Sequence, residues 1–216
     1  MIIKYLGHST FLFKAEDGTT VLTDPYKPGA YGGALTYAPI ADSADIVVLS
    51  HDHEDHADLQ SLPNQPLVVR SEARVRGIDF DVIHTYHDAV EGKERGKNRI
   101  TCFIMDDIRV CHAGDLGHVL SESQVAEIGA LDVLLLPVGG RFTLGPADAT
   151  HVAGQLRPKV VIPMHFKTDK CGFPIEPVTA FLEGKSDIKR SPTSEVILHK
   201  EDLPEKCTVL YIPPGN

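Results

Sequence analysis

Short apolar runs separated by polar turns recur along the chain and predict a protein rich in β-strands. The runs consist largely of β-branched and aliphatic residues, and Gly, Pro or Asp residues bound them, as is typical of strands. In the first half, strands are predicted over residues 2–6, 10–14, 19–23, 45–50, 66–70 and 81–86. In the second half, they are predicted over residues 99–105, 108–112, 132–136, 159–163, 195–199 and 207–212.

Helical spacing of apolar residues is confined to a few short segments, so helices are expected to be the minority. The predicted helices span residues 57–62, 71–76, 121–130, 146–156 and 176–183. Ser121 and Gln124 form a capping-box pattern, and Pro146 suits a first helical turn. Because strand-rich blocks alternate with single helices in both halves, we predict an α+β fold. Two mixed β-sheets would pack face to face with helices on both outer faces, as a four-layer αββα sandwich.

Length and composition favour one domain over residues 1–216, because no linker or low-complexity tract divides the chain. The first residues lack the features of a signal peptide, so a cytoplasmic location is expected. No apolar run approaches the ~18 residues that a membrane-spanning helix needs. The four cysteines are scattered and are expected to be reduced thiols. The oligomeric state is left open, a homo-oligomer included.

The charge balance argues against a nucleic-acid partner. With 21 Lys and Arg residues against 30 Asp and Glu residues, the chain carries a formal net charge of −9. Proteins that bind a phosphate backbone normally present a basic face. A local positive pocket remains compatible with this balance.

The polar segment 51–56, with the sequence HDHEDH, places three histidines directly after a predicted buried strand. If its start stays extended, the two-residue period of a strand points His51 and His53 to the same side. Asp55 and His56 lie where the chain turns, so their side chains diverge from the first pair. Neutral imidazole is the commonest metal ligand, and the spacing therefore predicts two adjacent metal ions. The structural alternative is a helix cap at Asp55 beside surface histidines.

Three other strand ends carry residues that would complete two metal sites. His87 is the expected third ligand of the first metal, and His165 would complete the second site. Asp115 follows a strand at Gly114, which permits close backbone approach, and its carboxylate is expected to bridge both ions. Each has a plainer alternative, namely a solvated loop histidine, an isolated histidine, or an aspartate in a turn.

Asp24 ends another predicted strand and is expected to orient a ligand, because metal-bound histidines usually donate their other N–H to a carboxylate or carbonyl. A turn residue before a proline is the alternative. His84 lies an odd number of positions before His87, points to the opposite face, and is expected to be structural. His112 and His118 are expected outside the ligand set or at the surface.

These residues together resemble a known family. The segment HDHEDH matches the pattern HxHxDH, and Thr-Asp-Pro at 23–25, His87, Gly-Asp at 114–115 and His165 extend the match over most of the chain. The set resembles the metallo-β-lactamase superfamily. Three further segments are similar to the small single-domain branch that includes ascorbate-6-phosphate lactonase-like hydrolases, namely Gly7-His-Ser-Thr-Phe11, Gly145-Pro-Ala-Asp-Ala149 and Pro163-Met-His-Phe166.

The resemblance implies two similar halves that form an αββα sandwich, with a dinuclear metal site at one edge of the sheets. Carried onto this sequence, it assigns one metal to His51, His53 and His87, the other to Asp55, His56 and His165, and the bridging position to Asp115. Asp55 and Asp115 would be the catalytic carboxylates. It also suggests that His8 lies near the metals, outside the ligand set.

Such a site implies a metal-dependent hydrolase. Two cations roughly 3.5–4 Å apart lower the pKa of a bridging water, and the resulting hydroxide would attack an ester, lactone or phosphodiester bond. Two carboxylates and one hydroxide against two divalent ions leave a local charge of about +1, so we expect a small anionic substrate. Zinc is the default ion, with manganese and iron open. No cysteine occupies a ligand position, and antibiotic hydrolysis is therefore not expected.

Two other classes of function remain open from the sequence. One is a metal-dependent binding or sensing module without turnover, and the other is a purely structural role for the His-rich loop. Substrate specificity is expected from the loops Tyr26–Pro39 and Asp88–Asn98, although the first could equally be ordinary surface. Lys167 and Lys170 are either contacts for an anionic group or solvated surface residues.

Overall fold

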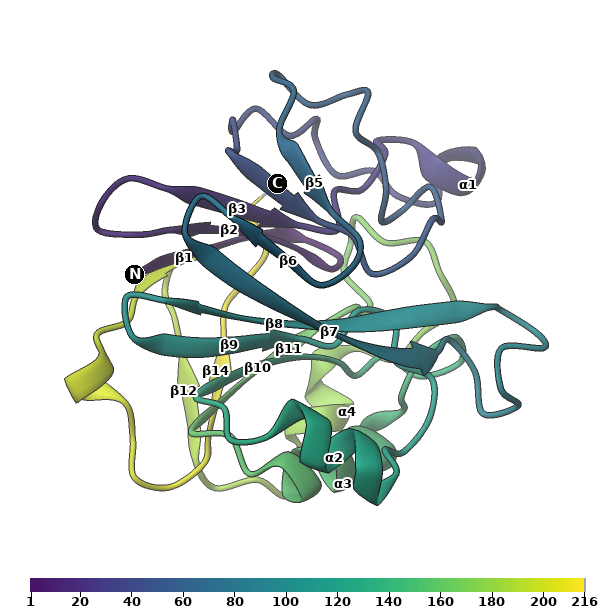
Figure 1. The fold of residues 1–216 in the computed structure, drawn as a ribbon. Coiled ribbons are helices and arrows are strands. Elements are labelled where there is room, and N and C mark those ends of the chain that lie inside the picture. Colours follow the sequence, from purple (N-terminus) through teal and green to yellow (C-terminus); the bar gives the residue numbers. More distant parts are fainter. Residues whose placement is uncertain (216) are drawn as a thin grey trace.

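The computed structural model describes residues 1–215, which form two β-sheets packed face to face (Figure 1). The first sheet has six strands in the order β13-β1-β2-β3-β4-β5. These strands are β1 (Ile2–Gly7), β2 (Thr10–Lys14), β3 (Thr20–Thr23), β4 (Ile46–Val48), β5 (Leu67–Val69) and β13 (Glu195–Ile197). Strands β13, β1, β2 and β3 pair antiparallel, whereas β3, β4 and β5 run parallel, so this sheet is mixed.

The second sheet is also mixed and has eight strands in the order β12-β14-β11-β10-β9-β8-β7-β6. They are β6 (Ala73–Val75), β7 (Ile78–Tyr86), β8 (Lys97–Met105), β9 (Ile108–His112), β10 (Val133–Pro137), β11 (Val160–Met164), β12 (Ile188–Arg190) and β14 (Thr208–Tyr211). Strands β6 to β9 pair antiparallel, and β9, β10, β11, β14 and β12 run parallel. The predicted architecture of two mixed sheets is thereby confirmed.

Helices cover the outer face of the eight-stranded sheet. Figure 1 shows α2 (Glu122–Ile128), α3 (Pro146–Leu156) and α4 (Val178–Leu182) gathered on that face. Helix α2 begins with the predicted capping box of Ser121 and Gln124, and α3 begins with Pro146 in its first turn. The longest described helix has 11 residues, and no helix within residues 1–215 is long and apolar enough to cross a bilayer.

The outer face of the six-stranded sheet carries loops and the single turn α1 (Ala30–Gly33). Apolar residues of the segment 26–44 pack there against Leu12, Leu22 and Val47 of the sheet, and Tyr26 and Tyr37 are buried among them. A short 3₁₀ turn, η1 (Lys200–Asp202), lies near the C-terminus. This sheet is therefore covered by an ordered loop more than by helix.

Two predicted helices are wrong, because each segment forms a turn or a hairpin instead. In the segment 57–62, the Asp58 carboxylate accepts the backbone N–H groups of Gln60 and Ser61, which favours a turn over a helix. The segment 71–76 holds β6, which pairs with β7 across a two-residue turn. Arg76 and Gly77 both have positive φ, 51° and 82°, as the favoured hairpin turns require.

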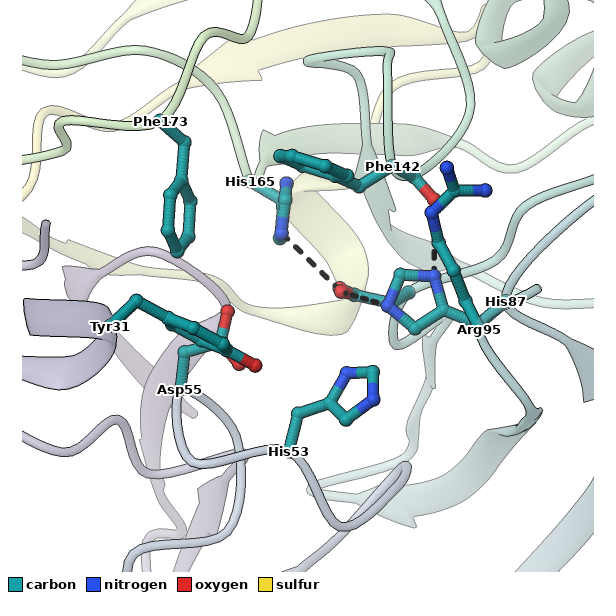
Figure 2. Close-up of a pocket in the computed structure, with 9 residues that line it drawn as sticks. Tyr31, His53, Asp55, His87, Arg95, Phe142, His165 and Phe173 are labelled. Carbon is teal, nitrogen blue, oxygen red and sulfur yellow. Dashed lines mark hydrogen bonds and ion pairs between the residues drawn. The ribbon is translucent and has the colours of Figure 1, made fainter.

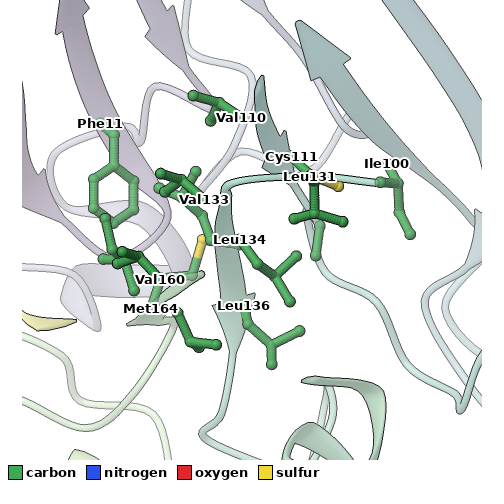
Figure 3. Packing of buried hydrophobic residues seen from close by; sticks show 14 of the residues in the cluster. Phe11, Ile100, Val110, Cys111, Leu131, Val133, Leu134, Leu136, Val160 and Met164 are labelled. Carbon is green, nitrogen blue, oxygen red and sulfur yellow. The ribbon is translucent and has the colours of Figure 1, made fainter. Parts of the chain in front are cut away.

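The main core lies between the two sheets and is almost wholly apolar. Alternate side chains of both sheets meet there, and Phe13 of β2 packs edge to face on Phe103 of β8 with ring centroids 5.3 Å apart. Strand β10 is buried on both faces, as expected for a central parallel strand, and Figure 3 shows part of this cluster. Burying each such side chain contributes about 1.5–3 kcal/mol. The core thus fixes the two sheets against each other.

The two sheets approach each other closely near Gly114, just after β9. A Cβ atom at Gly114 would lie 2.4 Å from both Ser50 Cβ, after β4, and Asn98 Oδ1 in β8. The φ of Gly114 is also positive, at 56°, which disfavours any L-side chain. A glycine here therefore allows the end of β9 to meet the end of β4.

We expect Gly114→Ala to lower the free energy of unfolding by about 2–4 kcal/mol, because it adds overpacking to backbone strain. The matched control is Gly18→Ala, since Gly18 has a φ of 90° but nothing within 4 Å of the added Cβ; it should cost only about 1 kcal/mol. Urea unfolding of both variants measures the difference. Equal losses would show that the sheets do not constrain Gly114.

Candidate metal centre

The predicted ligands meet at the edge where several parallel strands end. Asp24 directly follows β3, the segment 51–56 follows β4, and Asp115 follows β9. His87 directly follows β7, and His165 directly follows β11. Carboxyl ends of parallel strands meet at one edge of a sheet, where ligand sites are commonly built. The structure brings all seven predicted metal ligands to this edge.

The first predicted group is compact. One ligand atom from each of His51, His53 and His87 lies within 4.8 Å of the others. His51 Nε2 is 3.0 Å from His53 Nδ1. His51 and His87 are buried, and His53 is partly exposed. These three side chains have the spacing of ligands to one ion.

The second predicted group gathers Asp55, His56 and His165, and the structure adds His8 to it. The ligand atoms of all four lie within 4.8 Å of one another. His8 Nε2 is 3.0 Å from Asp55 Oδ2, so His8 holds that carboxylate. All four residues are buried. His8 lies near the cluster as the sequence suggested, and its contact with Asp55 is what the sequence left unassigned.

The Asp115 carboxylate lies between the two groups. Its Oδ2 atom is 3.0 Å from His87 Nε2, 3.2 Å from His56 Nε2, 3.3 Å from His165 Nε2 and 3.9 Å from His51 Nε2. Two of these imidazoles belong to each group. Asp115 is buried, and its backbone N–H donates to Asn98 Oδ1 at 2.9 Å. One oxygen atom is thus shared by both groups, as in a bridging ligand.

The chemistry of these donors fits divalent cations. Asp55 Oδ1, Asp115 Oδ1 and His56 Nε2 are buried and have no hydrogen-bond partner within residues 1–215. Buried polar atoms without partners are costly and call for an explanation. Imidazole and carboxylate ligands at this density suit zinc, iron or manganese. A pair of metal ions would satisfy these atoms together.

Acceptors behind the imidazoles fix their orientation. Asp24 Oδ2 accepts from His56 Nδ1 at 3.0 Å, and the Phe142 carbonyl accepts from His87 Nδ1 at 3.0 Å. Each contact leaves Nε2 of its ring aimed at Asp115. Asp24 also accepts the Ser50 backbone N–H at 2.7 Å. This is the arrangement expected of residues that orient metal ligands.

The charge state of the cluster suits cation binding. Burial, together with the neighbouring His56, lowers the pKa of His51 to about 3. Burial would raise the pKa of Asp115, but the surrounding histidines outweigh burial and hold that pKa well below its usual range. For His56, burial is outweighed by Asp115 and Asp55, which raise its pKa well above the ordinary value. A metal ion bound to His56 would replace the proton on its imidazole.

Three residues at the same place have a strained backbone. His8, Asp24 and His165 have φ values of 54°, 36° and 50°, in the left-handed region that costs roughly 1–2 kcal/mol for L-residues. The loops are tied together, since the His165 N–H donates to the His8 carbonyl at 2.9 Å. Strained residues of this kind cluster at functional sites.

A cavity of about 340 Å³ opens above the cluster (Figure 2). His53, Asp55, His87, Asp115 and His165 line its floor, and four residues outside the predicted set complete its lining, namely Tyr31, Arg95, Phe142 and Phe173. The first two lie in the loops that the sequence marked for specificity. Nothing in the sequence pattern distinguished Phe142 and Phe173.

The remaining candidates lie outside the cavity. Lys167 Nζ donates to the Phe173 carbonyl at 2.9 Å, so it braces the cavity wall, and neither it nor Lys170 is among the lining residues. His84 is exposed on β7 and is not among the lining residues. His118 Nε2 accepts the Tyr86 N–H. His112 is buried, and its Nδ1 atom is 3.9 Å from Asp24 Oδ2.

The loop after His87 is built around one carboxylate. Asp88 accepts the backbone N–H groups of four residues, Val90, Gly92, Glu94 and Arg95, at 2.8–3.0 Å. Burial opposes the charge of Asp88, but these N–H groups outweigh burial and lower its pKa to about 2. The loop therefore has a defined shape.

Comparison with known proteins agrees with this geometry. A family described as a beta-lactamase superfamily domain matches residues 2–165. The chain belongs to the metallo-β-lactamase superfamily. The resemblance of the sequence to this superfamily is thereby confirmed, whereas its narrower likeness to the lactonase-like branch stays a prediction.

Relatives of this superfamily member cover most of its length. The UPF0173 metal-dependent hydrolase of Archaeoglobus fulgidus is 31% identical over 78% of this chain and 84% of its own. A protein of the same name from Nitratidesulfovibrio vulgaris is 32% identical over 77% of this chain and 80% of its own. A crystal structure from Thermotoga maritima, described as that of a candidate Zn-dependent hydrolase of the superfamily, has 36% identity and a TM-score of 0.79 over 98% of this chain and 99% of its own.

We expect Asp24→Asn to weaken metal binding by about 10–100-fold, because it removes the acceptor that orients His56. Asparagine tolerates the left-handed backbone of this position, so the fold should persist. Competition with a chromophoric chelator measures the affinity. Asp45→Asn, which changes a carboxylate bound to Thr20, is the control and should leave the affinity unchanged. A comparable loss in both variants would contradict the role of Asp24.

We expect Asp88→Asn to lower the free energy of unfolding by about 1–3 kcal/mol at neutral pH, by weakening charge-assisted hydrogen bonds. The pKa of Asp88 is depressed in the folded state. The wild-type advantage should therefore be complete above about pH 4 and shrink as the pH falls toward 2. Urea unfolding at a series of pH values measures it. An advantage that grows on acidification would refute this account.

Proposed function

We propose that this protein is a hydrolase with two divalent metal ions that cleaves an ester, lactone or phosphodiester bond in a small anionic molecule. The observation that carries the proposal is the single Asp115 oxygen shared by imidazoles of two ligand groups. A carboxylate oxygen in this position can bind two cations that lie side by side. A single ion would leave one group of buried ligands without a partner.

The ligand assignment follows from the two groups. His51, His53 and His87 would hold one ion, and Asp55, His56 and His165 would hold the other. Asp115 would bridge them. Zinc is the proposed ion, because imidazole predominates and because a related structure is assigned to the Zn-dependent hydrolases. Manganese and iron suit the same donors.

When bound, two such ions would lower the pKa of a water between them and stabilise negative charge that develops on the substrate. The chain's own residues organise the reaction around this chemistry. Asp115 and Asp55 keep their charges, since their pKa values are held well below the usual range. His8 fixes the Asp55 carboxylate through the 3.0 Å contact of its Nε2 atom.

The cavity supports a small-molecule substrate. Its volume of about 340 Å³ lies near the lower end of the range for ligand pockets. Two divalent ions outweigh the charges of Asp55 and Asp115, which favours an anionic substrate. The relatives named metal-dependent hydrolases support hydrolysis over a sensing role. A lactone is one substrate class within this proposal, in line with the lactonase-like sequence segments.

We expect the purified protein to contain two metal ions per chain by elemental analysis and to hydrolyse a member of a panel of lactones, esters and phosphodiesters. Asp115→Asn should lower turnover by about 10³-fold or more, because both ligand groups lose their shared carboxylate. The control is Asp132→Asn, a buried aspartate paired with Lys159 and Lys200, which should keep full turnover.

Two outcomes would contradict the proposal. A protein that stays free of metal after zinc and manganese are supplied would remove the basis for the ligand groups. A protein that binds two ions and retains substrate-sized anions, but turns over nothing in the panel, would favour the binding or sensing module instead.

A further inference from the structure

The cavity above the cluster has two chemically different ends. Figure 2 shows Arg95 on the side of His87 and Phe142, whereas Tyr31 and Phe173 lie on the opposite side. The histidines and aspartates of the floor lie between these ends. Among the nine lining residues, Arg95 is the one arginine or lysine. A molecule that spans the cavity would therefore meet a fixed positive charge at one end and aromatic surface at the other.

Arg95 is held in place by the loop that carries it. The Arg95 backbone N–H donates to Asp88 Oδ2 at 2.8 Å, and the same carboxylate binds three other N–H groups of the loop. The loop closes through the His87 N–H, which donates to the Gly96 carbonyl at 3.0 Å. Because the backbone of the loop is already held, little loop entropy is lost when Arg95 binds a ligand.

The Arg95 guanidinium remains available to a ligand. Its carbon atom lies 5.8 Å from the centroid of the Phe142 ring, which supports it from one side. Its ion-pair partner is the neighbouring Glu94, whose side chain is 60% exposed. Exposed pairs of this kind contribute little. An oxyanion inside the cavity would gain bidentate, charge-assisted hydrogen bonds that this exposed partner does not replace.

The opposite end offers a small aromatic wall. The Tyr31 and Phe173 rings meet edge to face with centroids 5.5 Å apart, and Phe173 also meets Phe142, at the Arg95 end, edge to face at 5.9 Å. Tyr31 is 49% exposed, so its ring is open to a ligand. Apolar groups that bury against such rings are stabilised by the loss of water-exposed surface.

We propose that Arg95 is the specificity-determining residue of this site and binds a carboxylate or phosphate of the substrate that is remote from the bond to be cleaved. An apolar part of the same molecule packs against Tyr31 and Phe173, so the cleavable bond lies over the cluster between them. The substrate class is thus an amphipathic monoanion or dianion with a hydrolysable bond in its middle. This inference rests on the proposed function, since it names the substrate class of that site.

Calorimetric titration of the full-length, metal-loaded protein tests the role of Arg95 without turnover. The probes are 3-phenylpropionate, 2-phenylethyl phosphonate and the neutral 3-phenylpropionamide. Any contribution of the metal ions to anion binding is common to wild type and variants, so the comparison isolates the guanidinium. The two anionic probes distinguish a carboxylate receptor from a phosphate receptor.

We expect Arg95→Gln to weaken binding of at least one anionic probe by about 10–100-fold, the scale of losing charge-assisted hydrogen bonds. Binding of the amide should change by less than about 2-fold. The matched control is Arg141→Gln, because Arg141 lies 5.7 Å from the same Phe142 ring but does not line the cavity. This variant should bind all three probes as the wild type does.

Equal losses for anions and amide, unchanged anion binding in Arg95→Gln, or the same loss in Arg141→Gln would each overturn the inference. Failure of the proposed function has a different signature. In that case, metal content or turnover fails in the wild type, whereas the same titrations on the protein as purified still measure the binding preference that depends on Arg95.

Discussion

The buried carboxylate of Asp115 is the feature on which the rest of the site depends. A carboxylate without compensation is costly to bury, and this one is surrounded by imidazole nitrogens at 3.0–3.9 Å. The imidazoles are themselves fixed by acceptors behind them, such as Asp24 for His56. Bound positive charge would offset the cost of burying this carboxylate. The geometry of the cluster requires that five separate strand ends arrive at one place.

The fold supplies that convergence by splitting the cluster between two sheets. Asp24 and the segment 51–56 come from the six-stranded sheet, whereas His87, Asp115 and His165 come from the eight-stranded sheet. The cluster therefore exists only when the apolar core has packed the sheets together. Gly114 removes the side chain that would keep the two edges apart. The packing of the core thus determines how the cluster residues are positioned at the edge of the sheets.

The residues of the cluster were predictable from the sequence because each follows a strong strand signal. The apolar run before His51 and the run before His165 both predict a buried strand, and a polar residue at the end of such a strand has few structural uses. The cavity walls were not predictable in the same way. Tyr31 and Arg95 lie in loops whose shape depends on contacts with distant residues or on one carboxylate, and Phe173 is positioned by the Lys167 contact with its carbonyl. Neither kind of contact produces a regular pattern of residues in the sequence.

The same reasoning explains the errors in the elements. The segment 57–62 has helical spacing, but Asp58 binds the N–H groups that a helix would need. Strand β12 was not predicted from the sequence. It lies at a sheet edge and is only partly buried, so its apolar pattern is too weak to recognise. Local hydrogen bonds and edge positions thus limit what periodicity predicts, whereas buried central strands are predicted well.

The most direct test of the dinuclear site is anomalous X-ray diffraction from crystals of the zinc-loaded protein. We expect two anomalous peaks about 3.5–4 Å apart, with Asp115 between them and with His51, His53 and His87 around one and Asp55, His56 and His165 around the other. A single peak at full zinc occupancy, or two peaks that Asp115 does not bridge, would contradict it.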